Sequence, residues 1–283
     1  MVVSELIAKG MTLIEGKEYS NPRLESILVL SHLLNVDKSY IYIHGDKNVE
    51  ESIENEFIDI IKKRAEGYPL QYLLNEEEFM GLTFYVEEGV LIPRPDTEVL
   101  VRFIIDYIKN QEMNVLDIGI GSGAISLSIA EYCPNSRVYG IDIEEIPIKI
   151  ANFNKEKLKI SNTNFYQGDL FKALEDHNID EKFHMIVSNP PYIKTRDIEG
   201  LQIEVKDHEP WIALDGGEDG LDFYRRISKD ALDYLNHEGM LIYEIGYDQG
   251  NQVMNILNKE GFKNISILKD YQGNDRVVYG FKK

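Results

Sequence analysis

The sequence predicts an α/β protein, in which a mainly parallel β-sheet with helices on both faces follows a small helical bundle and a connecting β-hairpin. Three observations lead to this fold class. From residue 114 onward, short apolar strand-like runs alternate with segments of helical periodicity. Residues 1–74 show helical periodicity alone, and residues 75–95 contain two short apolar runs. We therefore expect a helical domain at 1–74, a hairpin linker at 75–95 and a sheet domain at 96–283.

The N-terminal part is expected to form at least two helices. Residues 22–34 place leucines and isoleucines at spacings of three and four, which puts them on one helix face. Asn21 supplies an N-cap, and Pro22 fits the first helical position. Residues 50–66 repeat the apolar pattern around Phe57, with charged residues on the opposite face. This is typical of a small helical bundle.

The next segment changes character. Residues 79–86 and 90–93 read as two short strands joined at a turn that contains Gly89. Asp96 or Thr97 is expected to cap the helix that follows.

The remaining chain alternates strands with helices. Apolar runs rich in β-branched and aromatic residues predict strands at 115–118, 138–142, 164–167, 183–188, 240–244, 265–268 and 276–281. Periodic segments predict helices at 124–131, 147–158, 220–235 and 250–259.

Composition narrows the function classes. The chain carries 30 Lys and Arg against 49 Asp and Glu, a net charge of −19, so it lacks the basic footprint of a nucleic-acid binder. Its single cysteine, Cys133, excludes an internal disulfide and fits the reducing cytoplasm. No apolar run is long enough to span a membrane, and no His or Cys cluster indicates a metal site. We expect a cytoplasmic monomer, although the sequence does not determine the oligomeric state.

The motif Asn189-Pro190-Pro191-Tyr192 directly follows the strand predicted at 183–188. Neither proline has an N–H, so the strand cannot continue. The Asn189 side-chain oxygen and the Pro190 backbone oxygen are thus two hydrogen-bond acceptors on a backbone that the prolines make rigid. Such a pair suits both hydrogens of a planar –NH2 group. An ordinary Asn-Pro turn is the alternative.

A glycine loop provides the second motif. Residues Gly119, Ile120, Gly121, Ser122 and Gly123 lie between a predicted strand and a predicted helix. Asp142 ends the next strand, where a carboxylate can bind ribose hydroxyls. The chain has no Gly-Lys-Ser/Thr phosphate loop, and the glycine spacing differs from that of dinucleotide sites. These features favour a nucleoside ligand without phosphates, such as S-adenosylmethionine, over a plain tight turn.

Together these motifs resemble the release-factor glutamine methyltransferases (the HemK/PrmC family) across essentially the whole chain. The glycine loop resembles the first motif of Rossmann-like S-adenosylmethionine-dependent methyltransferases, with Ile120 where threonine is usual. The Asn-Pro-Pro-Tyr motif resembles that of enzymes that methylate planar nitrogens. Further matching segments are 91–98, 186–193, 208–210, 216–221, 244–246 and 275–278.

The resemblance implies an enzyme that transfers a methyl group from S-adenosylmethionine to the glutamine amide nitrogen of the Gly-Gly-Gln loop in peptide chain release factors, leaving S-adenosylhomocysteine. It implies that the fourth sheet strand lies beside the first, so that Asn189 faces the glycine loop. The implied cofactor contacts are residues 119–123, Asp142, Asp169, Leu170 and Asn189. Asn189 and Pro190 would be catalytic, and Pro191 and Tyr192 would bind substrate. The helical domain would dock the release factor.

Some alternatives remain open at this stage. Asp169 also reads as an exposed loop acid, and Tyr192 as a core aromatic. Adenine-specific DNA methyltransferases share the Asn-Pro-Pro motif, but the net charge of −19 disfavours them. A ribosomal-protein glutamine methyltransferase would differ at residues 93–98. A non-enzymatic cofactor-binding scaffold is the third alternative, which an assay of methyl transfer would separate from the others.

Overall fold

The computed structural model describes residues 1–17 and 19–283, and the chain divides into two compact units. We call them the helical unit (residues 1–76 and 201–208) and the sheet unit (residues 77–200 and 209–283). The sequence did not indicate that residues 201–208 belong with the N-terminal helices. Each unit is described by itself.

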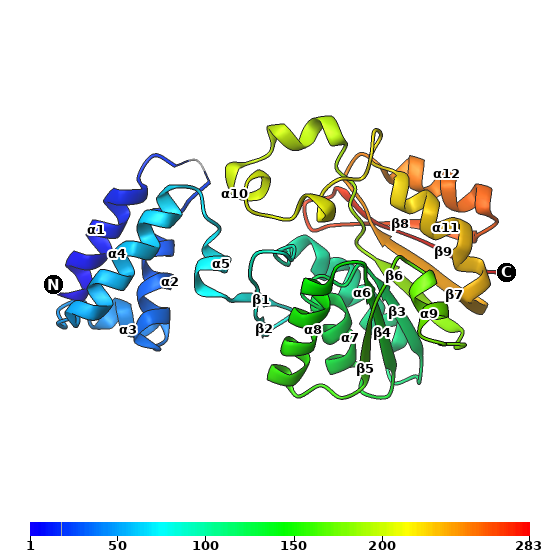
Figure 1. Cartoon of the computed structure of the whole chain (residues 1–283), viewed down its shortest axis with the longest axis horizontal. Coiled ribbons are helices and arrows are strands. Elements are labelled where there is room, and N and C mark those ends of the chain that lie inside the picture. The colour runs from blue at the N-terminus through cyan, green and yellow to red at the C-terminus, as the bar shows by residue number, and fades with distance from the viewer. Residues whose placement is uncertain (18) are drawn as a thin grey trace. The chain divides into compact units, whose positions relative to one another are not determined.

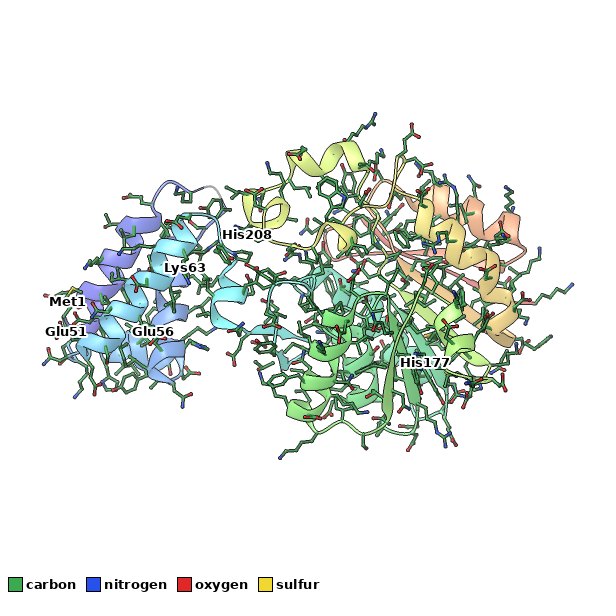
Figure 2. All side chains as sticks on the ribbon, viewed as in Figure 1. Met1, Glu51, Glu56, Lys63, His177 and His208 are labelled. Carbon is green, nitrogen blue, oxygen red and sulfur yellow. The ribbon has the colours of Figure 1, made fainter. Side chains whose placement is uncertain are left out.

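The helical unit is built from amphipathic helices around one apolar core. Its N-terminal helices are α1 (Val3–Ile14), α2 (Pro22–Leu34), α3 (Lys38–Ile43), α4 (Glu51–Ala65) and α5 (Leu70–Leu74), and α10 (Ile203–Lys206) comes from the later segment. The Asn21 side chain accepts a hydrogen bond from the Leu24 N–H and caps α2, as predicted. Leu6, Leu30 and Phe57 are fully buried in the core. The outer face of α4 instead carries charged side chains (Figure 2).

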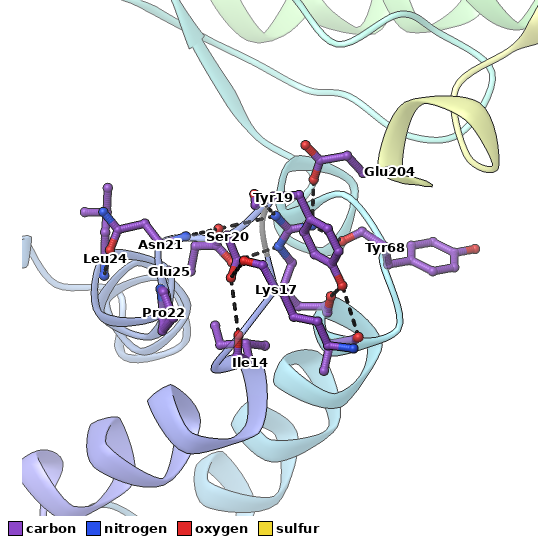
Figure 3. A network of polar contacts seen from close by, with 12 residues as sticks. Ile14, Lys17, Tyr19, Ser20, Asn21, Pro22, Leu24, Glu25, Tyr68 and Glu204 are labelled. Carbon is purple, nitrogen blue, oxygen red and sulfur yellow. Dashed lines mark hydrogen bonds and ion pairs between the residues drawn. The ribbon is translucent and has the colours of Figure 1, made fainter. Parts of the chain in front are cut away.

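A buried arginine joins the later segment to this unit through a polar network, in which Figure 3 labels Glu25, Glu204, Tyr19 and Tyr68. Arg64 on α4 is only 3% exposed. Its Nε donates to Glu25 at 2.8 Å, and its Nη1 donates to Glu204 at 2.7 Å. Its guanidinium also donates to the backbone oxygens of Tyr19 and Tyr68, both at 3.0 Å. Two carboxylates and two carbonyls thus compensate a charge that burial alone would make very costly.

The sheet unit contains a seven-stranded sheet in the order β5-β4-β3-β6-β7-β9-β8. Its strands are β3 (Asn114–Ile118), β4 (Arg137–Asp142), β5 (Thr163–Gln167), β6 (Phe183–Ser188), β7 (Leu235–Glu244), β8 (Lys263–Lys269) and β9 (Asp275–Phe281). β5, β4, β3, β6 and β7 pair in parallel, and only β9 pairs antiparallel, with β7 and β8. The mainly parallel sheet is confirmed, as is the placement of the fourth strand, β6, beside the first, β3.

Helices cover both faces of this sheet because alternate strand residues point to opposite sides. In β6, Val187 packs into one core with α6 (Glu98–Ile108) and α7 (Ala124–Tyr132). Its neighbour Ile186 packs into the other core with α11 (Asp222–Tyr234) and α12 (Gly250–Glu260), seen on the opposite side in Figure 1. The remaining α-helices of the unit are α8 (Glu145–Leu158) and the short α9 (Lys172–Asp176).

The predicted hairpin forms, but at a different place. Its strands are β1 (Glu77–Phe79) and β2 (Leu82–Phe84), which belong to the sheet unit by their contacts. The turn lies at Met80 and Gly81, which both have positive φ (53° and 75°), as a tight two-residue hairpin turn requires. The strand expected at 90–93 was wrong. Asn154 on α8 binds both the N–H and the C=O of Tyr85, at 2.7 and 2.9 Å, and so takes the backbone groups that a longer strand would use.

Candidate active site

A cavity of about 280 Å³ opens at the carboxyl ends of the parallel strands in the sheet unit. In the sheet, β3 lies between β4 and β6, and the cavity lies at the carboxyl end of β3. This is the topological switch point at which open α/β sheets bind ligands. Residues Gly119, Gly121, Asp142, Asp169, Leu170, Asn189, Pro190 and Pro191 line it. The structure therefore brings eight of the twelve site residues proposed from the sequence to one cavity.

The glycine loop between β3 and α7 offers bare backbone to this cavity. The N–H groups of Gly119 and Ile120 donate to the Ile141 carbonyl at 2.8 and 3.2 Å, which ties the loop to β4. Gly119 and Gly121 have positive φ (80° and 53°), and a Cβ atom built on either would meet no atom within 4 Å. Side chains there would occupy the cavity itself, so glycine keeps this space open for a ligand.

The other loop residues point away from the cavity. The Ile120 side chain is buried against Gly140. The Ser122 carbonyl accepts from Asn154 at 2.9 Å. A Cβ on Gly123 would lie 3.1 Å from the Ala151 side chain, so this glycine permits close packing of α7 on α8.

Asp142, at the end of β4, fixes the loop and also faces the cavity. Its Oδ2 accepts from the Gly121 N–H at 3.0 Å and its Oδ1 accepts from the Glu144 N–H at 3.2 Å. Burial raises the pKa of Asp142, although these two hydrogen bonds act in the opposite direction. Each carboxylate oxygen keeps a lone pair, so the group can also accept from ligand hydroxyls.

Asp169 and Leu170 also line the cavity, just after β5. Both Asp169 oxygens lie 2.8 Å from Arg226 Nη2 on α11. Sequence reasoning missed Arg226 and its cavity-lining neighbours Phe223 and Ile227, because α11 follows more than fifty positions later with only a core-like pattern.

Asn189 follows β6 and faces the cavity with a defined amide orientation. Its Nδ2 donates to the Thr97 hydroxyl at 3.4 Å, so its Oδ1 is the acceptor that remains. Thr97 ends the short 3-10 helix η1 (Pro95–Thr97) and makes no side-chain cap for α6. Thr97 occupies the N-cap position of α6, as expected, but its side chain makes no capping hydrogen bond: the helix starts through η1, and the Thr97 hydroxyl accepts from Asn189 instead.

Tyr192 stands behind the cavity wall. It packs against the core on the α11 side of the sheet, and its backbone oxygen accepts from Gln249 at 3.0 Å. Burial, followed by the negative charge of Glu244, raises the pKa of Tyr192 to about 12, so its hydroxyl is neutral at ordinary pH.

The segment after His208 supplies further cavity wall. Pro210, Ile212 and Ala213 line the cavity, while Trp211 is 46% exposed and donates to Asp215 at 3.2 Å.

Two charged residues of the segment at 91–98 also find separate partners. Arg94 pairs with the buried Glu209, whereas Glu98 binds Arg102 and the Met80 N–H. Arg94 and Glu98 do not pair with each other.

Among residues 1–17 and 19–283, no group of three or more His, Cys, Asp or Glu side chains is placed to hold a metal ion. Within that same part of the chain, every helix is too short or too polar to cross a bilayer.

Comparison with known proteins gives independent information on both units. A family model described as the PrmC N-terminal domain matches residues 5–74, and one described as a methyltransferase domain matches residues 109–212. Among solved structures, a methyltransferase from Pyrococcus furiosus covers 72% of this chain and 90% of its own, at 21% identity and a TM-score of 0.53. That likeness concerns the fold alone.

Curated relatives match nearly the full length. A release factor glutamine methyltransferase from Fusobacterium nucleatum is 43% identical over 98% of this chain and 78% of the relative. One from Clostridium acetobutylicum is 40% identical over 98% of both chains. With relatives of this identity along both units, the chain belongs to the release factor glutamine methyltransferases.

Proposed function

We propose that this enzyme transfers a methyl group from S-adenosylmethionine to the side-chain amide nitrogen of the glutamine in the Gly-Gly-Gln loop of peptide chain release factors. The observation that carries the proposal is that Asn189 and Pro190 share one cavity with the glycine loop and Asp142. Acceptors for a planar –NH2 group thus lie beside a nucleoside-type site. The proposed substrate also places the enzyme in the cytoplasm, where translation ends.

The residues present fit the methyl donor. Gly119 and Gly121 leave space where side chains would project, and Asp142 offers carboxylate oxygens for ribose hydroxyls. Leu170, Ile143 and Phe223 give the cavity apolar walls suited to an adenine ring. When bound, S-adenosylmethionine supplies an activated methyl group on a positively charged sulfur.

The chain's own task is to prepare the amide. A carboxamide nitrogen is a poor nucleophile because its lone pair is delocalised into the carbonyl. Asn189 Oδ1 and the Pro190 carbonyl are proposed to accept the two N–H bonds of the substrate amide, which fixes its plane. These acceptors also stabilise the positive charge that develops on nitrogen. The amide proton becomes acidic only after transfer, so no strong base is required beforehand.

The helical unit is proposed to dock the protein substrate. Among its described residues no group of His, Cys, Asp or Glu side chains is placed to hold a metal ion, while Tyr42 and Ile43 on α3 are 60% and 72% exposed. Apolar side chains of this size favour a protein contact surface. A Gly-Gly-Gln loop alone offers few contacts, so a second contact would supply the binding energy that positions it.

The decisive experiment is incubation of the purified enzyme with a release factor and S-adenosylmethionine, followed by mass spectrometry of the tryptic peptide that contains Gly-Gly-Gln. A gain of one methyl group on the glutamine is expected. Methylation that instead appeared on another residue, or none at all, would overturn the proposed substrate. The double variant Tyr42→Ala/Ile43→Ala should slow methylation of the whole release factor but not of a short peptide.

A further inference from the structure

Glu244 is a buried carboxylate next to Asn189 that the proposed mechanism does not use. The register of the sheet brings them together. Ser188 of β6 pairs with Tyr243 of β7. The residues that follow them along the chain, Asn189 and Glu244, are therefore lateral neighbours. Neighbouring residues on parallel strands direct their side chains to the same face. Glu244 is 2% exposed, and its Oε2 has no hydrogen-bond partner among the residues that the structure describes.

Three side chains therefore meet behind the cavity. The Asn189 amide nitrogen donates to the Thr97 hydroxyl at 3.4 Å, and the Thr97 and Asn189 side chains both lower the pKa of the adjacent Glu244 carboxyl, which favours its charged form. An Asn side chain can rotate by half a turn and exchange its oxygen for its nitrogen with little change of shape. Acceptors on one side of the amide remove this ambiguity, because only the nitrogen can face them.

In the part of the chain that the structure describes, no Lys or Arg side chain forms an ion pair with Glu244. The nearby Arg276 shares its Nη2 between Asp96 at 2.9 Å and Asp270 at 3.2 Å. The charged or titratable groups that face Glu244 are Arg276, Asp96, Tyr192 and Tyr224, with Asp270 behind Arg276. A buried carboxyl with so little compensation costs stability, and such groups gather at functional sites.

We propose that Glu244 is a positioning residue for methyl transfer, which together with Thr97 holds the amide nitrogen of Asn189 so that the Asn189 oxygen faces the substrate amide. This inference rests on the proposed function and adds to it the group that sets the polarity of the acceptor. The negative charge of the neighbouring carboxylate also polarises the Asn189 amide and makes its oxygen a stronger acceptor.

The ionisation of Glu244 gives the inference a distinctive readout. Burial raises the pKa of Glu244 to about 7, despite the opposing hydrogen bonds from Thr97 and Asn189 and the charge of Arg276. Once protonated, the carboxyl is a donor and can bind the Asn189 oxygen, which would hold the amide the wrong way round. Turnover at saturating substrates should therefore rise with pH and level off above about pH 7.

The test compares Glu244→Gln with wild type in a release-factor methylation assay, from about pH 5.5 to about pH 8.5. Glu244→Gln should bind S-adenosylmethionine as tightly as wild type in calorimetry. Its kcat should fall about tenfold or more and should lose the rise with pH. Thr97→Val should lower kcat in the same way, whereas Thr97→Ser, which keeps the hydroxyl, should not.

Tyr243→Phe is the matched control for lost stability. It removes a buried hydrogen bond to Ser228 from the adjacent strand position and should keep the wild-type pH profile. If Glu244→Gln and Thr97→Val both turn over like wild type with the wild-type pH profile, the positioning role is refuted. If wild type itself does not methylate a release factor, the proposed function fails instead, which the same assay reveals separately. If Glu244→Gln does not fold, the comparison of Thr97→Val with Thr97→Ser tests the positioning role instead.

Discussion

Replacing Glu244 by glutamine is expected to stabilise the folded sheet unit above neutral pH. The pKa of this carboxyl rises from 4.5 to about 7 on folding because of burial. Between these values the folded protein holds a proton that the unfolded chain has already released. The free energy of unfolding of wild type therefore falls as pH rises through this window. Glu244 makes its full stabilising contribution only below its ordinary pKa of 4.5.

The magnitude follows from the same two values. The interval from 4.5 to about 7, at about 1.36 kcal/mol for each pKa unit, corresponds to about 3 kcal/mol. Glutamine cannot ionise and so avoids this loss. Urea unfolding of both proteins at about pH 5 and about pH 8 should show that the stability difference between variant and wild type grows by about 2 to 3 kcal/mol in favour of the variant.

Two features make the measurement interpretable. Burial also raises the pKa of Asp117 to about 7, but that group is present in both proteins, so its effect cancels in the difference. Glu238→Gln, at an exposed position of the same strand, controls for the loss of a charge. A stability difference that is equal at both pH values would refute the reasoning, because Glu244 would then be ionised in the folded protein even in acid.

Three further outcomes are expected. Asn189→Ala should keep its affinity for S-adenosylmethionine in calorimetry but lose about 100-fold or more in kcat, and an equal collapse of affinity would contradict its assigned role. Asp142→Ala should weaken that affinity about tenfold or more, with turnover largely restored by excess S-adenosylmethionine; an unchanged dissociation constant would remove Asp142 from the ribose site. Arg64→Met should destabilise the helical unit by about 3 to 5 kcal/mol, because it leaves the buried Glu25 and the partly buried Glu204 without their cation, and hydrogen exchange of α2 and α4 that matches wild type would contradict this.

The sequence predicted those parts of the cavity whose signals are local. A glycine loop between strand and helix, an acid at the end of the next strand and an Asn followed by two prolines each constrain their own backbone. Thr97 was misread for the same reason: next to a helix, its local pattern indicates a cap, while its partner Asn189 lies 92 positions away. The role of Glu244 depends on which strand lies beside β6. The local sequence pattern does not show which strands are neighbours in the sheet.

The hairpin error has a similar cause. Gly89 is an obvious turn residue, yet the chain reverses at Met80 and Gly81, and a methionine with positive φ gives no sequence signal. A tertiary contact ends the strand at this point, because Asn154 of α8 forms hydrogen bonds with the Tyr85 backbone.

The inclusion of residues 201–208 in the helical unit changes how the enzyme can be dissected. The polypeptide passes between the units at 76–77, at 200–201 and again at 208–209, so no single cut separates them. A fragment that begins at residue 77 keeps Glu204 but loses Arg64, and Ile203 loses its close neighbour Gly67. Such a fragment carries an orphaned acid and an uncovered apolar side chain only a few positions before Pro210, which lines the cavity. Slow methylation by this fragment could arise from a disturbed cavity wall as well as from loss of substrate docking. Point substitutions on α3 are therefore the cleaner way to assign a docking role to the helices.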